Sequence, residues 1–528
     1  MEFSSYRKED YIFISRLYSL FGVFLLMCYN RNATIYIKKV SNIMKSLYTH
    51  TLRLSLLLVL AGSSFAYAAA PLPAAKPVPA GTAGTPAPAA MATAAKTPNN
   101  TKTASPILRR QPVPVFTTHY TKANPASLTS TLRWKPVLGT VYYNVNVTLP
   151  GGTALPAERT YVAGYNLALP QGTQGDVKVQ IQSFDLDEKP ISALSAVEDV
   201  YVDPAKKHAL YPVPISKFNS GNGTTLLYPV YNWIPIHGVR NYEVEVLNTD
   251  QVSPKQEATD DQLLERGKST GFDWYDDESH TAPYTMYWRV RAIDENGNPL
   301  SLFCPPQPMR CNPDDNWQVG TLGDSISHGG GDLSYSPSDF TYSYQYYLPF
   351  DSVNLSESGD TSDSTLARFD KDVVPFHPTY LIIMTGSNSL RGWTSGESVI
   401  SDLQGIKEKC ENNGIIPIFM TLPPVNPANI KKAFDEPTAE NWMDEIAKVN
   451  QWIRSLPWYI DLGTKFNENE ELPTKYALDG LHLNFRGKKL MAAAITEQWP
   501  GILQKIQDAA SAANEDNGQS ESDDSEGD

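Results

Sequence analysis

Residues 316–332 have the sequence NWQVGTLGDSISHGGGD, and the pattern around this stretch decides the fold. The apolar run 319–322 predicts a short strand, and Gly323, Asp324 and Ser325 follow at its carboxyl end. Downstream, apolar runs of strand length alternate with helical stretches, which indicates parallel strands, crossover helices and an open α/β sheet. In such sheets the functional groups collect beyond the carboxyl ends of the strands, so Ser325 is a candidate functional residue.

The later strands and helices follow the same alternation. The predicted strands are SVNLS (352–356), YLIIMTG (380–386), IIPIFMTL (415–422) and WYIDLG (458–463), and the predicted helices lie at 363–374, 397–414 and 441–457.

Ser325 needs a base if its hydroxyl is to act as a nucleophile, and histidine is the usual one. Two histidines that follow it fit poorly: His328 lies in the same turn, and His377 precedes a strand, at the opposite edge of the sheet. His482 remains, in DGLH, with Asp479 three residues before it. In a turn that leads into a helix, this spacing lets the carboxylate accept from Nδ1 and leaves Nε2 facing the serine. We therefore expect a catalytic triad of Ser325, His482 and Asp479.

Acyl transfer also needs hydrogen-bond donors for the developing oxyanion. The backbone N–H of Ser325 is one candidate. Two others follow predicted strand ends: Gly359, in SGDTS, and Asn388, in GSN.

The ordered set GDS, SGDTS, GSN and DGLH resembles the SGNH, or GDSL, hydrolases over about residues 316–507. The resemblance implies a flavodoxin-like, three-layer α/β/α domain with strand order 2-1-3-4-5. It implies Ser325 as nucleophile, His482 as general base and then acid, Asp479 as the group that orients it, and an oxyanion hole from Ser325, Gly359 and Asn388. The family usually has an aspartate after this asparagine. Here the residue is Ser389, which predicts altered support of the loop.

An internal repeat precedes this domain. LRWKPVLGTVYYNVNV (132–147) matches YNWIPIHGVRNYEVEV (231–246), with Trp134 over Trp233 and Tyr143 over Tyr242. Period-two alternation predicts strands, and the two modules resemble fibronectin type III or immunoglobulin-like β-sandwiches. We expect both tryptophans to pack in cores.

Composition separates the remaining segments. The 528-residue chain has a net charge of -14 and no clustered basic face, which argues against nucleic-acid binding.

We predict the following segments: 1–43, an over-extended start or a membrane anchor; 44–68, a signal peptide; 69–112, a Pro- and Ala-rich linker; 113–205 and 206–310, two β-sandwich modules; 311–510, the hydrolase domain; 511–528, a disordered acidic tail.

The four cysteines allow one disulfide, if the protein is exported, and no zinc site. Cys304 and Cys311 are close enough in sequence to close a small loop as a disulfide, and no pair has the spacing of a zinc site. We expect Cys410 to be a buried thiol.

We therefore expect an exported serine esterase, periplasmic, surface-bound or secreted, that acts without a metal or cofactor. Its substrate would be an acylated glycan, with Trp393 lining a sugar subsite and the sandwich modules contacting glycan or cell envelope, or else a small ester or lipid. The alternatives are a lipase or lysophospholipase, a transferase that moves acetyl groups between sugars, and a non-catalytic surface protein with an esterase-like scaffold.

Overall fold

The computed structural model describes residues 112–330 and 339–523, and side chains up to residue 512. The predicted signal peptide, the segment before it and nearly all of the linker lie outside the described residues. The chain divides into two compact units, Met1–Ala104 and Ser105–Asp528, and every described residue belongs to the second. None of the described helices has the length and apolar character needed to cross a membrane.

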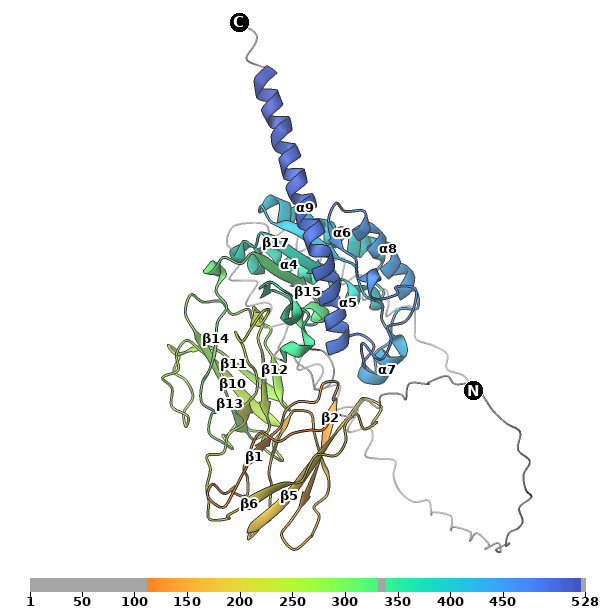
Figure 1. The fold of residues 1–528 in the computed structure, drawn as a ribbon. Helices are drawn as coiled ribbons and strands as arrows, with labels where there is room; N and C mark the ends of the chain where they lie inside the picture. The colour runs from red at the N-terminus through yellow and green to blue at the C-terminus, as the bar shows by residue number, and fades with distance from the viewer. Residues whose placement is uncertain (1–111, 331–338, 524–528) are drawn as a thin grey trace, which may run out of the picture. The chain divides into compact units, whose positions relative to one another are not determined.

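The first described segment forms two antiparallel sheets (Figure 1, orange to yellow). Its strands are β1 (Thr131–Arg133), β2 (Tyr142–Thr148), β3 (Glu158–Thr160), β4 (Gly164–Asn166), β5 (Gly175–Phe184) and β6 (Glu198–Val202). One sheet has the order β3-β2-β5-β6, and β1 pairs with β4. Alternate residues of β5 are buried, as period-two patterning predicts for a strand with one face on a core.

The second segment also forms two antiparallel sheets, with orders β11-β10-β13-β14 and β12-β9-β7. The strands are β7 (Val213–Pro214), β9 (Val230–Ile234), β10 (Asn241–Leu247), β11 (Leu263–Thr270), β12 (Asp273–Tyr275), β13 (Met286–Ile293) and β14 (Gln307–Met309).

The sequence repeat has a structural counterpart. Trp134 and Trp233 are 3% and 0% exposed, so the expectation of core packing is confirmed. The hydroxyl of Tyr143 accepts a hydrogen bond from the backbone N–H of Val137 at 3.0 Å, and Tyr242 makes the equivalent bond with Ile236 at 3.0 Å. The same turn is therefore fixed in the same way in both repeats. The resemblance of the two modules to fibronectin or immunoglobulin domains stays a prediction.

The third segment contains a parallel sheet of order β19-β18-β17-β15-β16-β8. Its strands are β8 (Thr225–Leu226), β15 (Val319–Gly323), β16 (Val353–Asn354), β17 (Tyr380–Met384), β18 (Ile416–Met420) and β19 (Tyr459–Ile460). From β15 onward the order is 2-1-3-4-5, so the predicted parallel α/β sheet is confirmed. The sequence did not predict β8, which comes from residues before the second module's core strands and extends the sheet beyond β16.

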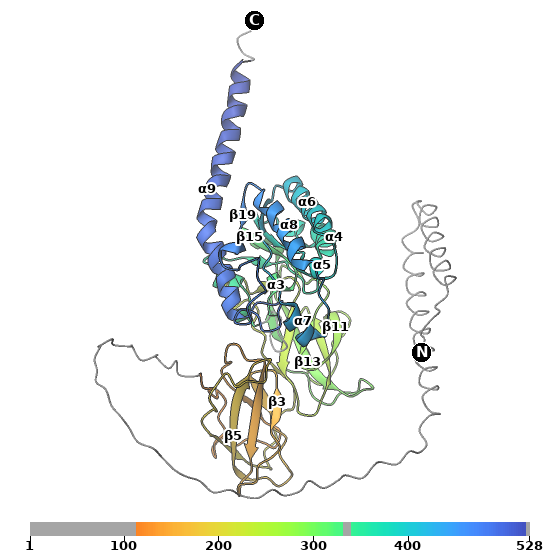
Figure 2. The same cartoon turned by 90° about the vertical axis from the view of Figure 1, so that its right-hand side faces the viewer.

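Helices cover both faces of this sheet. They are α3 (Ser325–His328), α4 (Ser362–Asp372), α5 (Ser387–Arg391), α6 (Gly396–Asn412), α7 (Pro427–Phe434), α8 (Trp442–Arg454) and α9 (Phe485–Asp523). Short 3-10 helices lie at Pro313–Asp315, Phe340–Tyr342, Gln345–Tyr347, Val374–Phe376 and Leu462–Thr464. Figure 2 shows the sheet between α9 on one side and α4, α6 and α8 on the other, which is a three-layer arrangement.

The predicted disulfide is wrong, because both Cys304 and Cys311 are free thiols. Cys304 packs in the core of the second module, whereas Cys311 packs in the core of the α/β domain. Strand β14 lies between them and keeps the chain extended at about 3.3 Å per residue, so the two side chains enter different cores. Cys410 is buried and free, as expected.

The carboxyl-terminal segment also differs from the expectation of disorder. Helix α9 continues through Asp523, well past residue 511. Extending a helix that is already formed needs no new nucleation, so polar residues can continue it. Residues 524–528 lie outside the described residues.

Candidate active site

The nucleophile candidate lies where strand β15 meets helix α3. Asp324 caps this short helix, with Oδ1 accepting from the backbone N–H of Ile326 at 3.0 Å, and Ser325 is its first residue. Gly323 is required here, because a Cβ would lie 1.9 Å from the carbonyl oxygen of Met384 on the neighbouring strand. The close approach of two strands therefore fixes the position from which Ser325 projects.

The structure brings the three predicted triad residues together. Ser325 Oγ lies 2.9 Å from His482 Nε2, and His482 Nδ1 lies 2.7 Å from Asp479 Oδ2. The other oxygen of Asp479 accepts from the backbone N–H groups of Leu481 and His482, at 2.9 and 2.7 Å. Asp479 is 1% exposed, and the backbone of its own turn holds its carboxylate in place. Because this carboxylate accepts from Nδ1 of His482, Nδ1 carries the proton and the lone pair of Nε2 faces the serine.

The turn that carries this pair depends on Gly480. Its φ is +82°, and a Cβ would lie 2.4 Å from the carbonyl oxygen of Asn426. The DGLH sequence thus places a glycine where both the backbone angle and the available space demand one.

The predicted oxyanion donors lie around one pocket with the triad. The pocket, of about 230 Å³, is lined by Ser325, Gly359, Asn388 and His482, with Tyr275, Ser358, Arg391, Phe434, Glu436 and Leu481. Ser325 is the first residue of helix α3, so its N–H has no acceptor within the helix, and among the described loop and turn bonds the N–H of Gly359 donates to no carbonyl. Donors that are not already paired can stabilise charge that develops on a substrate oxygen.

Asn388 is oriented by two hydrogen bonds. Its Nδ2 donates to the carbonyl oxygen of Asp360 at 2.8 Å, and its Oδ1 accepts from Arg391 Nε at 3.0 Å. These contacts assign the two ends of the amide and leave the second hydrogen of Nδ2 for another acceptor.

Ser389 stands where the resembled family usually has an aspartate. Its Oγ accepts from the backbone N–H of Ser362, at the start of α4, at 2.9 Å. Ser362 Oγ in turn donates to Asp402 Oδ2 at 2.6 Å, so a carboxylate from α6 contributes to this junction. The loop is supported by a serine pair and by Asp402, and Asn388, the predicted oxyanion donor, lines the pocket.

Arg368 supports the loop that carries Gly359. This guanidinium donates from Nε to Asp360 Oδ2 and from Nη1 to the carbonyl oxygen of Leu355, both at 2.7 Å. The two acceptors flank residues 356–359, so one partly buried cation holds both ends of the loop.

Two buried groups behind the nucleophile were not predicted as part of the site. Lys488, on α9, is 0% exposed and donates to the carbonyl oxygen of Ile326. Burial lowers its pKa to about 7, against the attraction of the Asp324 and Asp479 carboxylates. Burial likewise raises the pKa of Asp324 to about 6. In RGKKLMA the sequence gives no signal that separates Lys488 from its neighbour Lys489.

His328 is the second missed group. Its Nδ1 lies 2.9 Å from Ser358 Oγ and accepts from the Ser358 N–H at 3.1 Å, and its Nε2 lies 2.8 Å from the carbonyl oxygen of Tyr228. Burial lowers the pKa of His328 to about 4, so the ring is neutral and donates from Nε2. The expectation that it is not the base of Ser325 agrees with this geometry.

Trp393 is not brought to the pocket. It follows α5 with φ +67°, is 62% exposed, and does not line the cavity. The pocket geometry therefore gives no support to Trp393 as a sugar subsite.

Comparison with known proteins agrees with this geometry. Residues 321–490 match the GDSL-like Lipase/Acylhydrolase family. No curated protein matches the chain.

Three solved structures illustrate the similarity. A GDSL-like lipase from Bacteroides thetaiotaomicron VPI-5482 is 21% identical, with 34% of this chain and 85% of that chain covered and a TM-score of 0.26. The lipase/acylhydrolase from Enterococcus faecalis is 21% identical, with 35% and 96% covered and a TM-score of 0.27. A member of the lipolytic protein G-D-S-L family from Veillonella parvula DSM 2008 is 16% identical, with 34% and 96% covered and a TM-score of 0.27.

The family match covers the end of the strand that precedes Ser325, both predicted oxyanion loops and the DGLH turn. Residues 321–490 form a GDSL-like lipase/acylhydrolase domain, and the chain is an ester-bond hydrolase.

Proposed function

We propose that the chain is a serine esterase that cleaves carboxylic esters through an acyl-enzyme on Ser325. The observation that carries this proposal is the 2.9 Å separation of Ser325 Oγ and His482 Nε2. His482 accepts the hydroxyl proton as Oγ attacks the ester carbonyl, and then donates it to the departing alcohol. Water, deprotonated by the same imidazole, attacks the acyl carbon and releases the acid and the free serine.

Asp479 and the oxyanion donors act throughout both steps. The carboxylate keeps Nδ1 protonated and stabilises the imidazolium that forms in each transition state. Ser325 N–H, Gly359 N–H and Asn388 Nδ2 would donate to the carbonyl oxygen when it becomes negatively charged. The unpaired backbone donors beside the nucleophile support this role.

We propose a short acyl group, because the catalytic pocket is small. Its volume of about 230 Å³ is below the roughly 300–1,000 Å³ of pockets that enclose drug-sized ligands. We propose an acetyl ester of a carbohydrate as the substrate class, and export of the chain through the signal sequence at 44–68 to the periplasm, surface or medium where such glycans occur. A fatty acyl ester is the competing substrate class.

A panel of esters tests the proposal. Nitrophenyl acetate, butyrate, octanoate and palmitate, with an acetylated xylan and an acetylated chitin oligomer, are assayed with the wild type and with Ser325→Ala. We expect turnover that falls with acyl length, release of acetate from a glycan, and no turnover by the variant. Preference for palmitate would replace the carbohydrate proposal with a lipase. Product analysis with an added sugar acceptor separates hydrolysis from acetyl transfer.

A further inference from the structure

Tyr275 belongs to the second all-β module, yet it lines the catalytic pocket with Ser325 and His482. It is the last residue of β12 and pairs with Val230, the first residue of β9. The side chain is 41% exposed. A large ring that is exposed in the lining of this pocket is available to a ligand.

Residues 225–227, shortly before the Val230 that pairs with Tyr275, are attached to the hydrolase sheet by backbone hydrogen bonds. Strand β8 ends at Leu226 and pairs with β16, and the N–H of Leu227 donates to the carbonyl oxygen of Asn354 at 2.9 Å. Five residues after Asn354 comes Gly359, an oxyanion donor. A short hydrogen-bonded path therefore joins Tyr275 to the loop that carries Gly359.

Side chains strengthen the same junction. The hydroxyl of Tyr228 donates to Asp372 Oδ2 on α4 at 2.5 Å, and its carbonyl oxygen accepts from His328 of the nucleophile helix. His328 also contacts Ser358, which lines the pocket. The buried imidazole of His328, in the same helix as Ser325, therefore contacts both the oxyanion loop and the second module.

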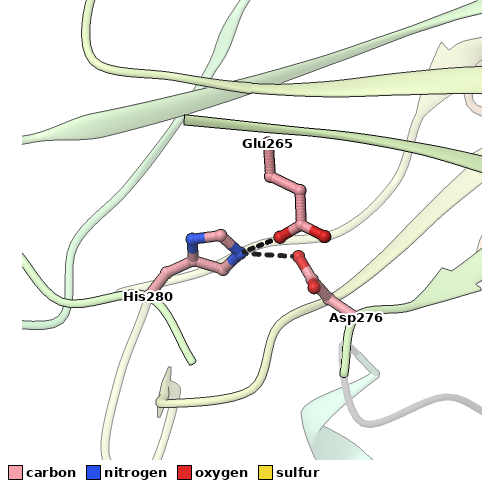
Figure 3. A group of neighbouring side chains, drawn as sticks. All are labelled: Glu265, Asp276 and His280. Atoms are coloured by element: carbon pink, nitrogen blue, oxygen red, sulfur yellow. Dashed lines mark hydrogen bonds and ion pairs between the residues drawn. The ribbon is translucent and has the colours of Figure 1, made fainter. Parts of the chain in front are cut away.

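A charged cluster holds the chain directly after Tyr275. Figure 3 shows His280 Nε2 between the carboxylates of Asp276 and Glu265, at 2.7 and 3.1 Å. Asp276 also accepts from the hydroxyl of Tyr231 at 3.2 Å. Burial alone would lower the pKa of His280, but the two carboxylates outweigh it and raise the pKa to about 9. The imidazolium offsets part of the negative charge of the two carboxylates, and the cluster holds the backbone beside Tyr275.

The residues that line the pocket with Tyr275 include an aromatic side chain and charged side chains. Arg391 Nη1 donates to Glu436 Oε2 at 2.7 Å, and the Phe434 ring packs against His482 with centroids 5.8 Å apart. A sugar ring has C–H faces that pack on an aromatic side chain and hydroxyls that bond to a guanidinium and a carboxylate. This combination suits a polyhydroxylated ester better than a simple alkyl ester.

We propose that Tyr275 is a substrate-contact residue, through which the second all-β module takes part in binding the sugar part of the ester. The proposal rests on the proposed esterase function. In this proposal the second module contributes a residue to the active site. Tyr275, at the end of β12, then helps to determine which esters are cleaved.

Variants of two exposed tyrosines in the full chain test this proposal. Tyr275→Ala removes the ring, Tyr275→Phe keeps it, and Tyr284→Ala is the matched control, because Tyr284 is 47% exposed in the same module and does not line the pocket. Each variant is assayed with an acetylated xylo-oligosaccharide and with ethyl acetate, whose alcohol is too small to span the pocket.

We expect Tyr275→Ala to lower kcat/KM for the oligosaccharide about tenfold, mainly through KM, and to change kcat/KM for ethyl acetate less than about twofold. Tyr275→Phe and Tyr284→Ala should behave as the wild type with both esters. Equal loss on both esters, or no loss on either, would overturn the proposal. Activity that survives Ser325→Ala would instead overturn the esterase mechanism itself, so the two failures are distinguishable.

Discussion

Replacement of Asn388 by alanine should reduce turnover far more than stability. The variant loses the Nδ2 donor, and one oxyanion donor contributes about 10²–10³ in kcat in serine hydrolases. It also loses two hydrogen bonds, to the Asp360 carbonyl at 2.8 Å and from Arg391 Nε at 3.0 Å. At about 1 kcal/mol each, these lower the free energy of unfolding by roughly 2 kcal/mol.

Asn388→Asp separates the two effects. The carboxylate can still accept from Arg391, but it has no N–H to donate and places negative charge beside the developing oxyanion. Its kcat should fall at least as far as that of Asn388→Ala, with a smaller loss of stability. Initial rates with nitrophenyl acetate give kcat and KM, and urea unfolding gives the free energy. If kcat of Asn388→Ala stays within about threefold of the wild type, Asn388 is not an oxyanion donor.

Three further predictions concern the orienting carboxylate, the thiols and the charged cluster. Asp479→Asn should lower kcat about 10⁴-fold, because an amide can donate to Nδ1 of His482 and select the wrong tautomer; single-turnover acylation rates measure this, and a loss below about tenfold would argue against the orienting role. Alkylation of the unfolded, unreduced protein should label both Cys304 and Cys311 in a mass spectrum, and reductant should leave Tm unchanged, whereas a disulfide would block labelling and its reduction would cost about 2–4 kcal/mol. His280, with a pKa raised to about 9, stabilises the fold fully below its ordinary pKa of 6.5, and this contribution is lost as pH rises through 9. The free energy of unfolding should therefore fall by roughly 2–3 kcal/mol more in the wild type than in His280→Gln between pH 6 and 10, and parallel curves would contradict the assigned ion cluster.

The α/β part of the fold could be predicted because its signals are local. The strands from β15 to β19 lie in short apolar runs, and the polar motifs follow after strand ends. Parallel strands bring their carboxyl ends to one edge, which is why Ser325, Gly359 and Asn388 could be expected to meet. Asp479 and His482 add a fixed spacing in a turn whose glycine the geometry requires.

The contribution of the second module could not be predicted, because it depends on how separate segments pack. Strand β8 is only Thr225–Leu226, too short for a periodic signal, and its pairing with β16 is long-range. Tyr275 ends a three-residue strand with no motif around it. The disulfide prediction failed for a related reason: close spacing of Cys304 and Cys311 says nothing about which core each thiol enters.

Reaction with a fluorophosphonate probe measures whether His482 activates Ser325. We expect rapid stoichiometric labelling of the wild type, a modified peptide that contains Ser325, no labelling of Ser325→Ala, and labelling of His482→Ala slowed by orders of magnitude. If the wild type does not react, or if Ser325→Ala reacts as fast, Ser325 is not a nucleophile activated by His482.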